Sequence, residues 1–135
     1  MTQKDLFKYQ DCKKLYTEAK ERLAEFEETI FNPPSPTMDG MPKTHDDSNP
    51  ERLSETIDRH DELIANCNAC LIEYIRAGRI LDKAEEVLSP IEVTIVEKRY
   101  RLGIKDWEAI ADSIGYSVRR AFGYHKEALK KIANL

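Results

Sequence analysis

Residues 110–132 read IADSIGYSVRRAFGYHKEALKKI, a stretch in which a turn signal separates two helical patterns. Gly115 can supply a tight turn, and Ser117 is a preferred N-cap because its hydroxyl accepts hydrogen bonds from the first free amides of a helix. Small residues at Ala111 and Ala121 allow the two helices to cross closely. Helix, short turn and helix in this order are typical of a DNA-binding helix-turn-helix.

A further helix is predicted upstream, so that the whole segment has the size of a three-helix domain. Ser89, Pro90 and Glu92 have the spacing of a capping box with proline at the first helical position. Gly103 is expected to end that helix, and Asp106 to begin the next. The side chains predicted to face the core are Ile91, Ile95, Val96, Leu102, Trp107, Ile110, Ala111, Ile114, Ala121, Tyr124, Ala128, Leu129 and Ile132. His125 is predicted to flank this core or to be exposed, together with its neighbours Phe122 and Lys126.

The second helix of the motif is the predicted DNA reader. The N-terminal turn of a recognition helix enters the major groove, which assigns base contacts to Val118, Arg119 and Phe122. Contacts to phosphates are expected from a second group of polar and basic residues along the same helix. These are Ser117, Arg120, Lys126, Lys130 and Lys131.

Two long helices are predicted before this segment, which makes the protein all-α. We expect a helix over residues 1–31, a proline-rich loop over 32–50, a second helix over 51–88 and the DNA-binding domain over 89–135. The first helix has apolar residues at alternating spacings of three and four: Tyr9, Cys12, Tyr16, Ala19, Leu23, Phe26 and Ile30. The second repeats every seven residues at Ile57, Ile64, Leu71 and Gly78, and again at His60, Cys67, Tyr74, Leu81 and Leu88. Such coiled-coil seams require a partner, either within one chain as a hairpin or between chains as a homodimer.

Charge and composition limit the function classes. The formal net charge is -4, yet residues 90–135 carry nine basic and six acidic side chains, so the basic end is the one that bears the motif. No apolar run has the length of a membrane span, and the N-terminus has no signal-peptide pattern, which predicts a cytoplasmic protein. Three cysteines, two of them in Cys67-Asn-Ala-Cys70, are interpreted as reduced structural residues. His60 and the cluster His45-Asp46-Asp47 are interpreted as seam and polar loop, and no metal, cofactor or catalytic set is predicted.

The sequence from Leu88 to Ile132 resembles region four of bacterial sigma factors. It is more similar to the sigma-region-four-like regulators of phages and prophages, the ArpU and RinA group. Three features carry the resemblance: Ser35-Pro36 with Asp39-Gly40-Met41-Pro42, Gly115-Tyr116-Ser117, and His125-Lys126 followed by Ala128-Leu129. The resemblance implies a phage- or prophage-encoded gene activator that binds double-stranded DNA at a promoter in the bacterial cytoplasm. Val118 and Gly123 depart from the pattern, because these regulators often have a polar residue at the first position and helices disfavour glycine.

Two other functions remain open from the sequence. The motif can serve as a protein-interaction module that binds RNA polymerase or a host regulator without reading DNA. Alternatively, the chain is a structural or packaging factor that holds DNA with little sequence preference. Salt-insensitive behaviour toward DNA would favour the first, and equal binding to unrelated duplexes would favour the second.

Overall fold

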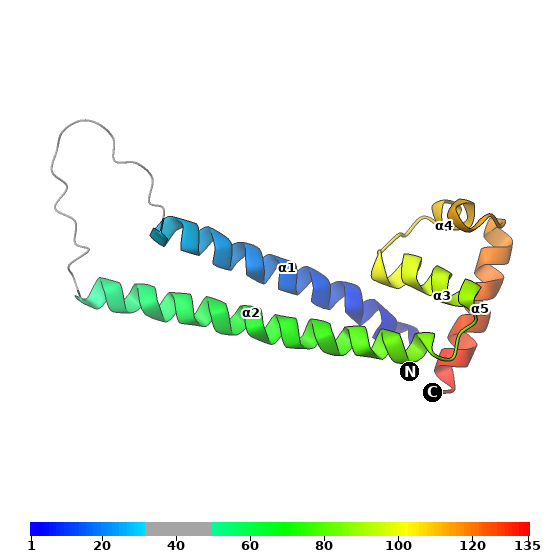
Figure 1. The fold of residues 1–135 in the computed structure, drawn as a ribbon, viewed down its shortest axis with the longest axis horizontal. Helices are drawn as coiled ribbons and strands as arrows, with labels where there is room; N and C mark the ends of the chain where they lie inside the picture. The colour runs from blue at the N-terminus through cyan, green and yellow to red at the C-terminus, as the bar shows by residue number, and fades with distance from the viewer. Residues whose placement is uncertain (32–49) are drawn as a thin grey trace, which may run out of the picture. The chain divides into compact units, whose positions relative to one another are not determined.

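The computed structural model describes residues 1–31 and 50–135, and the described residues form helices and no strands. In chain order the helices are α1 (Gln3–Phe31), α2 (Pro50–Glu85), α3 (Pro90–Val96), the π-helical turn η2 (Glu97–Arg101), α4 (Trp107–Ile114) and α5 (Val118–Ala133) (Figure 1). The all-α class predicted from the sequence is confirmed. The predicted loop features at 32–49, including Asp39-Gly40 and His45-Asp46-Asp47, lie outside the described residues.

Residue contacts divide the described chain into two compact units. The terminal unit contains Met1–Lys14 and Ile72–Leu135, and the hairpin unit contains Leu15–Leu71. The terminal unit therefore combines the predicted DNA-binding segment with the beginning of α1 and the end of α2. Among the described residues, every helix is too short or too polar to cross a bilayer.

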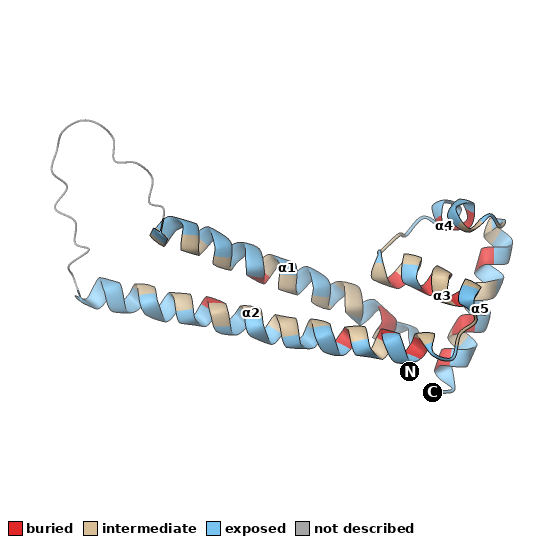
Figure 2. Cartoon of the chain, viewed as in Figure 1, coloured by how far each residue is buried: buried red, intermediate tan, exposed pale blue. Residues whose placement is uncertain are grey.

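Helices α1 and α2 pack against each other within one chain, which selects the hairpin from the two arrangements left open by the sequence. In the hairpin unit, the Phe26 ring stacks with His60 at 6.1 Å between centroids, and Glu27 Oε1 lies 3.0 Å from His60 Nε2. In the terminal unit, the Tyr9 and Tyr74 hydroxyls lie 3.0 Å apart. Every predicted seam residue of α1 is buried or half-buried (Figure 2).

The seam predicted for the second long helix is confirmed at every position but one. Ile57 is 51% exposed. The other predicted seam residues are buried or half-buried: His60, Ile64, Cys67, Leu71, Tyr74, Gly78, Leu81 and Leu88. Leu63, Ala77 and Ala84 are also buried, so the buried face of α2 is wider than the two predicted heptad positions. Gly78 lies against α1, because a Cβ placed on it would be in van der Waals contact with the Tyr9 ring at 3.7 Å.

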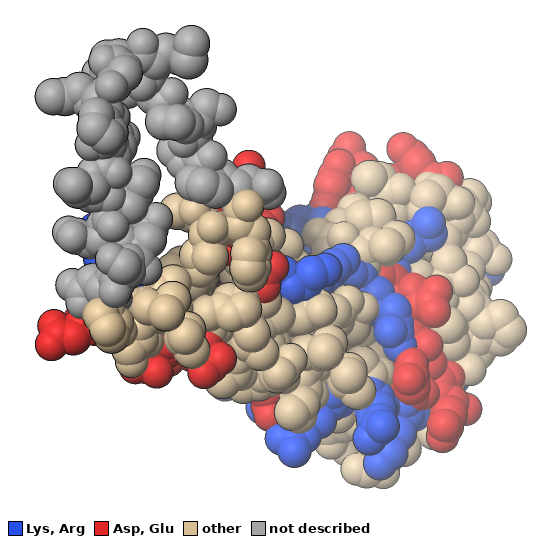
Figure 3. All heavy atoms as spheres, turned by 60° about the vertical axis from the view of Figure 1, so that its left-hand side comes forward, with Lys and Arg blue, Asp and Glu red and all other residues tan. Residues whose placement is uncertain are grey.

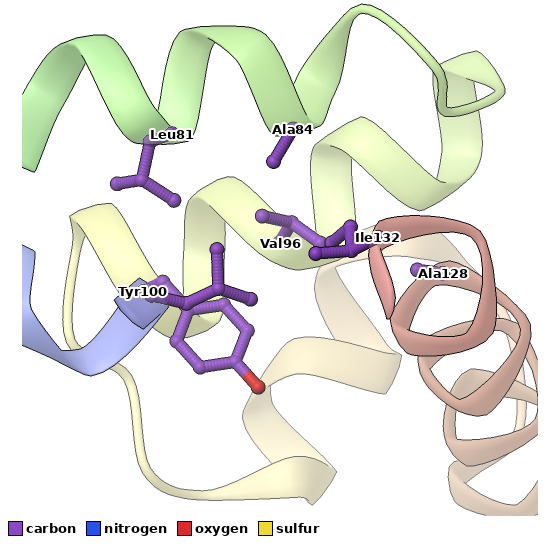
Figure 4. Close-up of a cluster of buried hydrophobic side chains, with 7 residues drawn as sticks. Leu81, Ala84, Val96, Tyr100, Ala128 and Ile132 are labelled. Carbon is purple, nitrogen blue, oxygen red and sulfur yellow. The ribbon is translucent and has the colours of Figure 1, made fainter. Parts of the chain in front are cut away.

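The core of the terminal unit contains side chains from five helical elements. Leu81 and Ala84 come from α2, while residues of α3, η2 and α5 close around them (Figure 4). The complete cluster is Leu6, Leu81, Ala84, Val96, Tyr100, Ala128 and Ile132. Leu6 is fully buried and belongs to α1, so the first helix of the chain is part of this core. Burial of such apolar surface is the main stabilising contribution to folding.

The helix that begins at Pro90 widens into the π-helical turn before it ends. Leu102 N–H donates to the Glu97 carbonyl at 2.9 Å, a bond that spans five residues. Because a wider turn changes the angular phase of the residues after it, Tyr100 points into the core and Leu102 is 66% exposed. The prediction that Leu102 is buried was therefore wrong. Gly103 has φ 72° and ends the helix as predicted.

Candidate nucleic-acid interface

The turn between α4 and α5 follows from local backbone chemistry. Gly115 has φ 75°, its N–H donates to the Asp112 carbonyl at 3.3 Å, and Tyr116 N–H donates to the Ala111 carbonyl at 3.1 Å. This pair of bonds is the Schellman arrangement, which satisfies carbonyls left without partners at a helix end. Ser117 then accepts from Arg120 N–H at 3.3 Å and caps α5. Both roles predicted for this turn are confirmed.

Asp106 begins α4 in the same way, because its carboxylate accepts from Glu108 N–H at 3.0 Å. Ser89 is different. It occupies the N-cap position of α3, but its side chain caps no backbone amide and its hydroxyl donates to Glu92 Oε1 at 2.9 Å. The expected capping box is therefore absent at this helix: Glu92 is only 5% exposed and turns toward α5, where Lys131 Nζ lies 2.7 Å from its carboxylate.

Helix α5 packs on α3 and α4 and exposes its N-terminal turn. Arg119 is exposed, and its side chain forms no ion pair with any residue in the described part of the chain. Val118 is half-buried, and Phe122 is 41% exposed with its ring stacked on Trp107 at 4.4 Å between centroids. The three predicted base-reading residues thus lie together, although the stacking holds Phe122 against the protein.

The predicted phosphate-binding residues are in less uniform surroundings. Arg120 lies over the Tyr116 ring at 5.2 Å, which is a cation–π contact, and Lys126 is exposed. Lys130 is paired with Glu127 at 3.7 Å on the surface, a weak interaction. Lys131 is only 44% exposed and is paired with the buried Glu92, so its charge is already partly compensated. Figure 3 shows basic and acidic side chains interspersed on one face, without a continuous basic field.

A polar network that is buried at Tyr100 and His125 connects α1, η2 and α5. Gln3 Nε2 donates to the Tyr100 hydroxyl at 3.1 Å, which leaves that hydroxyl to donate to His125 Nε2 at 2.6 Å. His125 is 6% exposed, so the prediction that it is flanking or exposed was wrong. Its ring lies on the same face of α5 as Ala121 and contacts the edge of Trp107 at 4.8 Å between centroids.

Burial is the main cause that lowers the pKa of His125, to about 4, and the positive charge of Arg99 acts in the same direction. Burial also raises the pKa of Tyr100, so its hydroxyl keeps the proton that it donates. At neutral pH the network therefore consists of uncharged groups. Sequence reasoning missed it because no local pattern indicates that Gln3 and His125 meet the same tyrosine.

A second set of contacts joins α1 to the end of η2. Gln10 Nε2 donates to the Tyr100 carbonyl at 2.8 Å and also to the Arg101 carbonyl, two groups that the helix end leaves without helical partners. Arg101 forms ion pairs with Asp82 and with Glu85, the latter at 3.2 Å. These contacts position the three C-terminal helices on the paired ends of α1 and α2 within the terminal unit.

No family model, curated protein or solved structure matches this chain. The resemblance to sigma region four and to the ArpU and RinA group therefore stays a prediction, carried by the residues of the motif.

The described cysteines form no disulfide, and no group of three or more His, Cys, Asp or Glu side chains suited to a metal ion occurs in residues 1–31 and 50–135.

Two glycines of the interface are expected to respond oppositely to alanine. Gly115→Ala should destabilise the protein by about 1–2 kcal/mol, because an L-residue is strained at φ 75°. Gly123→Ala should stabilise it by about 1 kcal/mol, because the position is helical and nothing lies within 4 Å of an added Cβ. Urea unfolding of both variants checks the signs; destabilisation by Gly123→Ala would show that α5 does not tolerate a side chain there.

Proposed function

We propose that this protein is a sequence-specific, double-stranded DNA-binding transcription regulator, a phage or prophage gene activator that acts at a promoter. The observation that carries the proposal is the α4–turn–α5 geometry. A Schellman turn at Gly115 and an N-cap at Ser117 leave Val118 and Arg119 on the first turn of a 16-residue helix. The first turn of the second helix is the part of a helix-turn-helix that contacts base edges.

The residue types in that turn suit direct readout of bases. An arginine can donate two hydrogen bonds to the O6 and N7 atoms of guanine, and an aliphatic side chain can contact a thymine methyl. Arg119 is assigned to the first role and Val118 to the second. We assign Phe122 to the edge of the proposed reading surface, because its ring stacks on Trp107 and this limits how far it can reach.

Phosphate contacts are proposed chiefly for Ser117, Arg120 and Lys126. The Ser117 hydroxyl accepts from the Arg120 amide and can still donate its own proton, while the helix N-terminus favours an anion. Lys126 is exposed six residues after Arg120, nearly two turns further along α5. Lys130 and Lys131 are secondary in this proposal, since each is already paired with a glutamate.

Selection from a randomised duplex library tests the proposal. We expect one enriched motif, bound about a thousandfold more tightly than a scrambled duplex at physiological salt. Arg119→Ala should relax the preference at one base pair by about 1–3 kcal/mol, because it removes a bidentate base contact. Lys126→Ala should weaken binding to all duplexes alike. It should also reduce the slope of log K against log salt concentration by about one, because one fewer counterion is released.

The control for these variants is Arg79→Ala, an exposed position of α2 that has no assigned role in DNA binding. Enrichment of no motif together with weak, salt-insensitive binding would contradict the proposal and favour a module that binds RNA polymerase or a host regulator. Equal, salt-sensitive binding to unrelated duplexes would instead favour a structural or packaging factor.

A homodimer is the proposed oligomeric state, because a second copy raises the affinity of a small DNA module through effective concentration. The seam predicted to self-associate is used between α1 and α2 of one chain, so a dimer requires other side chains of the long helices. Leu53 and Ile57 of the hairpin unit are more than half exposed and are available for that role. An inverted repeat in the selected motif is the expected signature.

A further inference from the structure

A groove of the terminal unit lies between the beginning of α1 and the loop that leaves η2. Its cavity volume is about 770 Å³. Phe7, Asp11 and Lys14 line it from α1, and Arg99 and Lys105 line it from η2 and the loop. None of the residues assigned to DNA contact contributes to its lining.

Positive charge dominates this groove. Three cationic side chains face one carboxylate, in a chain whose formal net charge is -4. Lys14 and Lys105 are exposed, and neither ammonium group forms an ion pair with a residue of the described chain. These two charges are therefore available to a ligand.

Arg99 provides the rigid wall of the groove. Its Nη1 donates to the Ile104 carbonyl at 3.3 Å and to the Lys105 carbonyl at 2.8 Å, and its guanidinium lies 5.2 Å from the Trp107 ring centroid. Its buried Nε has no hydrogen-bond partner among the residues that the structure describes. Arginine held in this way keeps a fixed positive charge beside the cavity.

Phe7 adds an apolar surface to the charged groove. Its ring packs edge-on against Tyr100 at 5.0 Å between centroids, yet 38% of the residue remains exposed. Aromatic and arginine side chains are enriched where proteins bind one another. A ligand that matches the groove must therefore combine negative charge with an apolar group.

We propose that this groove binds an acidic peptide segment of a protein partner, in which an apolar side chain stands next to carboxylates. The carboxylates would pair with Lys14 and Lys105, and the apolar side chain would pack on Phe7. Asp11 favours a peptide over a DNA backbone, because a peptide N–H can donate to its carboxylate and a phosphodiester has no proton to donate. The site goes beyond the proposed DNA-binding function and does not depend on it.

A peptide selection on the full chain tests the proposal. The probe is a displayed library of random 12-residue peptides, selected on the wild type and counted again on the charge-reversal variant Lys14→Glu/Lys105→Glu. The matched control is Lys4→Glu/Arg79→Glu, which makes the same change in net charge at exposed positions outside the groove. Circular dichroism and the unfolding midpoint establish that both variants are folded.

We expect the enriched peptides to be acidic and to contain an aromatic or aliphatic residue beside an acid. Their affinity should fall at least about tenfold in the groove variant, where two attractions become repulsions, and should change little in the control. Enrichment without acidic residues, no enrichment, or equal losses in both variants would overturn the proposal. The proposal would also be overturned if the groove variant kept its peptide affinity but bound DNA more weakly and with a smaller dependence on salt concentration, since the groove would then contact phosphates. Arg119 does not line the groove, so a loss of DNA binding by Arg119→Ala would test the proposed DNA-binding function and not the peptide site.

Discussion

Leu6→Ala is expected to lower the free energy of unfolding of the terminal unit by about 2–5 kcal/mol, the usual range for a leucine truncated in a packed core. Leu6 is fully buried against residues of α2, η2 and α5. Urea unfolding followed by fluorescence measures this unit selectively, because Trp107 is the single tryptophan of the chain and lies within it. A loss of this size would show that the first helix is a structural part of the unit that contains the three C-terminal helices.

The matched control is Leu102→Ala, which truncates the same side chain at an exposed position of the terminal unit. Leu102 is 66% exposed, so its loss should cost about 0.5 kcal/mol or less. Equal, small losses for the two variants would contradict the packing of α1 on the C-terminal helices.

The same contacts predict that a fragment of residues 89–135 alone unfolds without a cooperative transition. The fragment lacks Leu6, Leu81 and Ala84, which pack with Val96 and Ile132 in the complete chain.

Acid is expected to destabilise the protein through His125 by about 3 kcal/mol. The pKa of His125 is lowered from 6.5 to about 4, so the folded state holds the neutral ring. Between these two values the unfolded chain binds a proton that the folded chain does not. Stability is therefore unaffected by this group above pH 6.5, falls as the pH decreases toward 4, and has lost the full amount below that.

The hydrogen bond from Tyr100 gives a structural reason why the folded protein keeps the His125 ring neutral. The tyrosine hydroxyl donates to His125 Nε2, and a protonated imidazole would present a second donor to it. We expect the free energy of unfolding of the wild type to fall more steeply from pH 6.5 to 4 than that of His125→Gln, which cannot titrate. NMR titration of the ring measures the pKa directly. Parallel pH profiles of the two proteins, or a ring that titrates near 6.5, would contradict this prediction.

The sequence predicted the helix ends best where they depend on neighbouring residues. The ends of α4 and α5 are set by Asp106, Gly115 and Ser117, which bond to amides and carbonyls within one helical turn. Because these bonds are local, the sequence alone predicts them. The apolar seam of α1 was predictable for a related reason, since helical periodicity brings one line of residues to the same face. The position of Val118 and Arg119 in the first turn of α5, which the proposed function uses, depends on these local signals.

Other features of the candidate sites depend on contacts between distant segments. The seam of α2 was predicted correctly except at Ile57, but the additional burial of Leu63 and Ala77 depends on how the helices pack, which the heptad pattern does not reveal. Leu102 was predicted to face the core, but Tyr100 is buried there instead. The π-helical turn rotates the residues after Val96 relative to a regular α-helix, and the apolar pattern does not reveal that rotation. Glu92 turned from its own helix end to Lys131 of α5, which removes a predicted phosphate contact from open solvent.

The sequence by itself determined that the chain forms two long helices and a C-terminal helix–turn–helix pattern, because helix periodicity and capping are properties of adjacent residues. Only the tertiary structure decided that α1 pairs with α2 within one chain, that Gln3 and Gln10 of α1 bind Tyr100, and that His125 is buried. The physical reason is that burial and hydrogen-bond satisfaction depend on which surfaces meet after folding. The groove of Lys14, Arg99 and Lys105 has the same origin, since its charges are separated by most of the chain and meet only in the folded terminal unit.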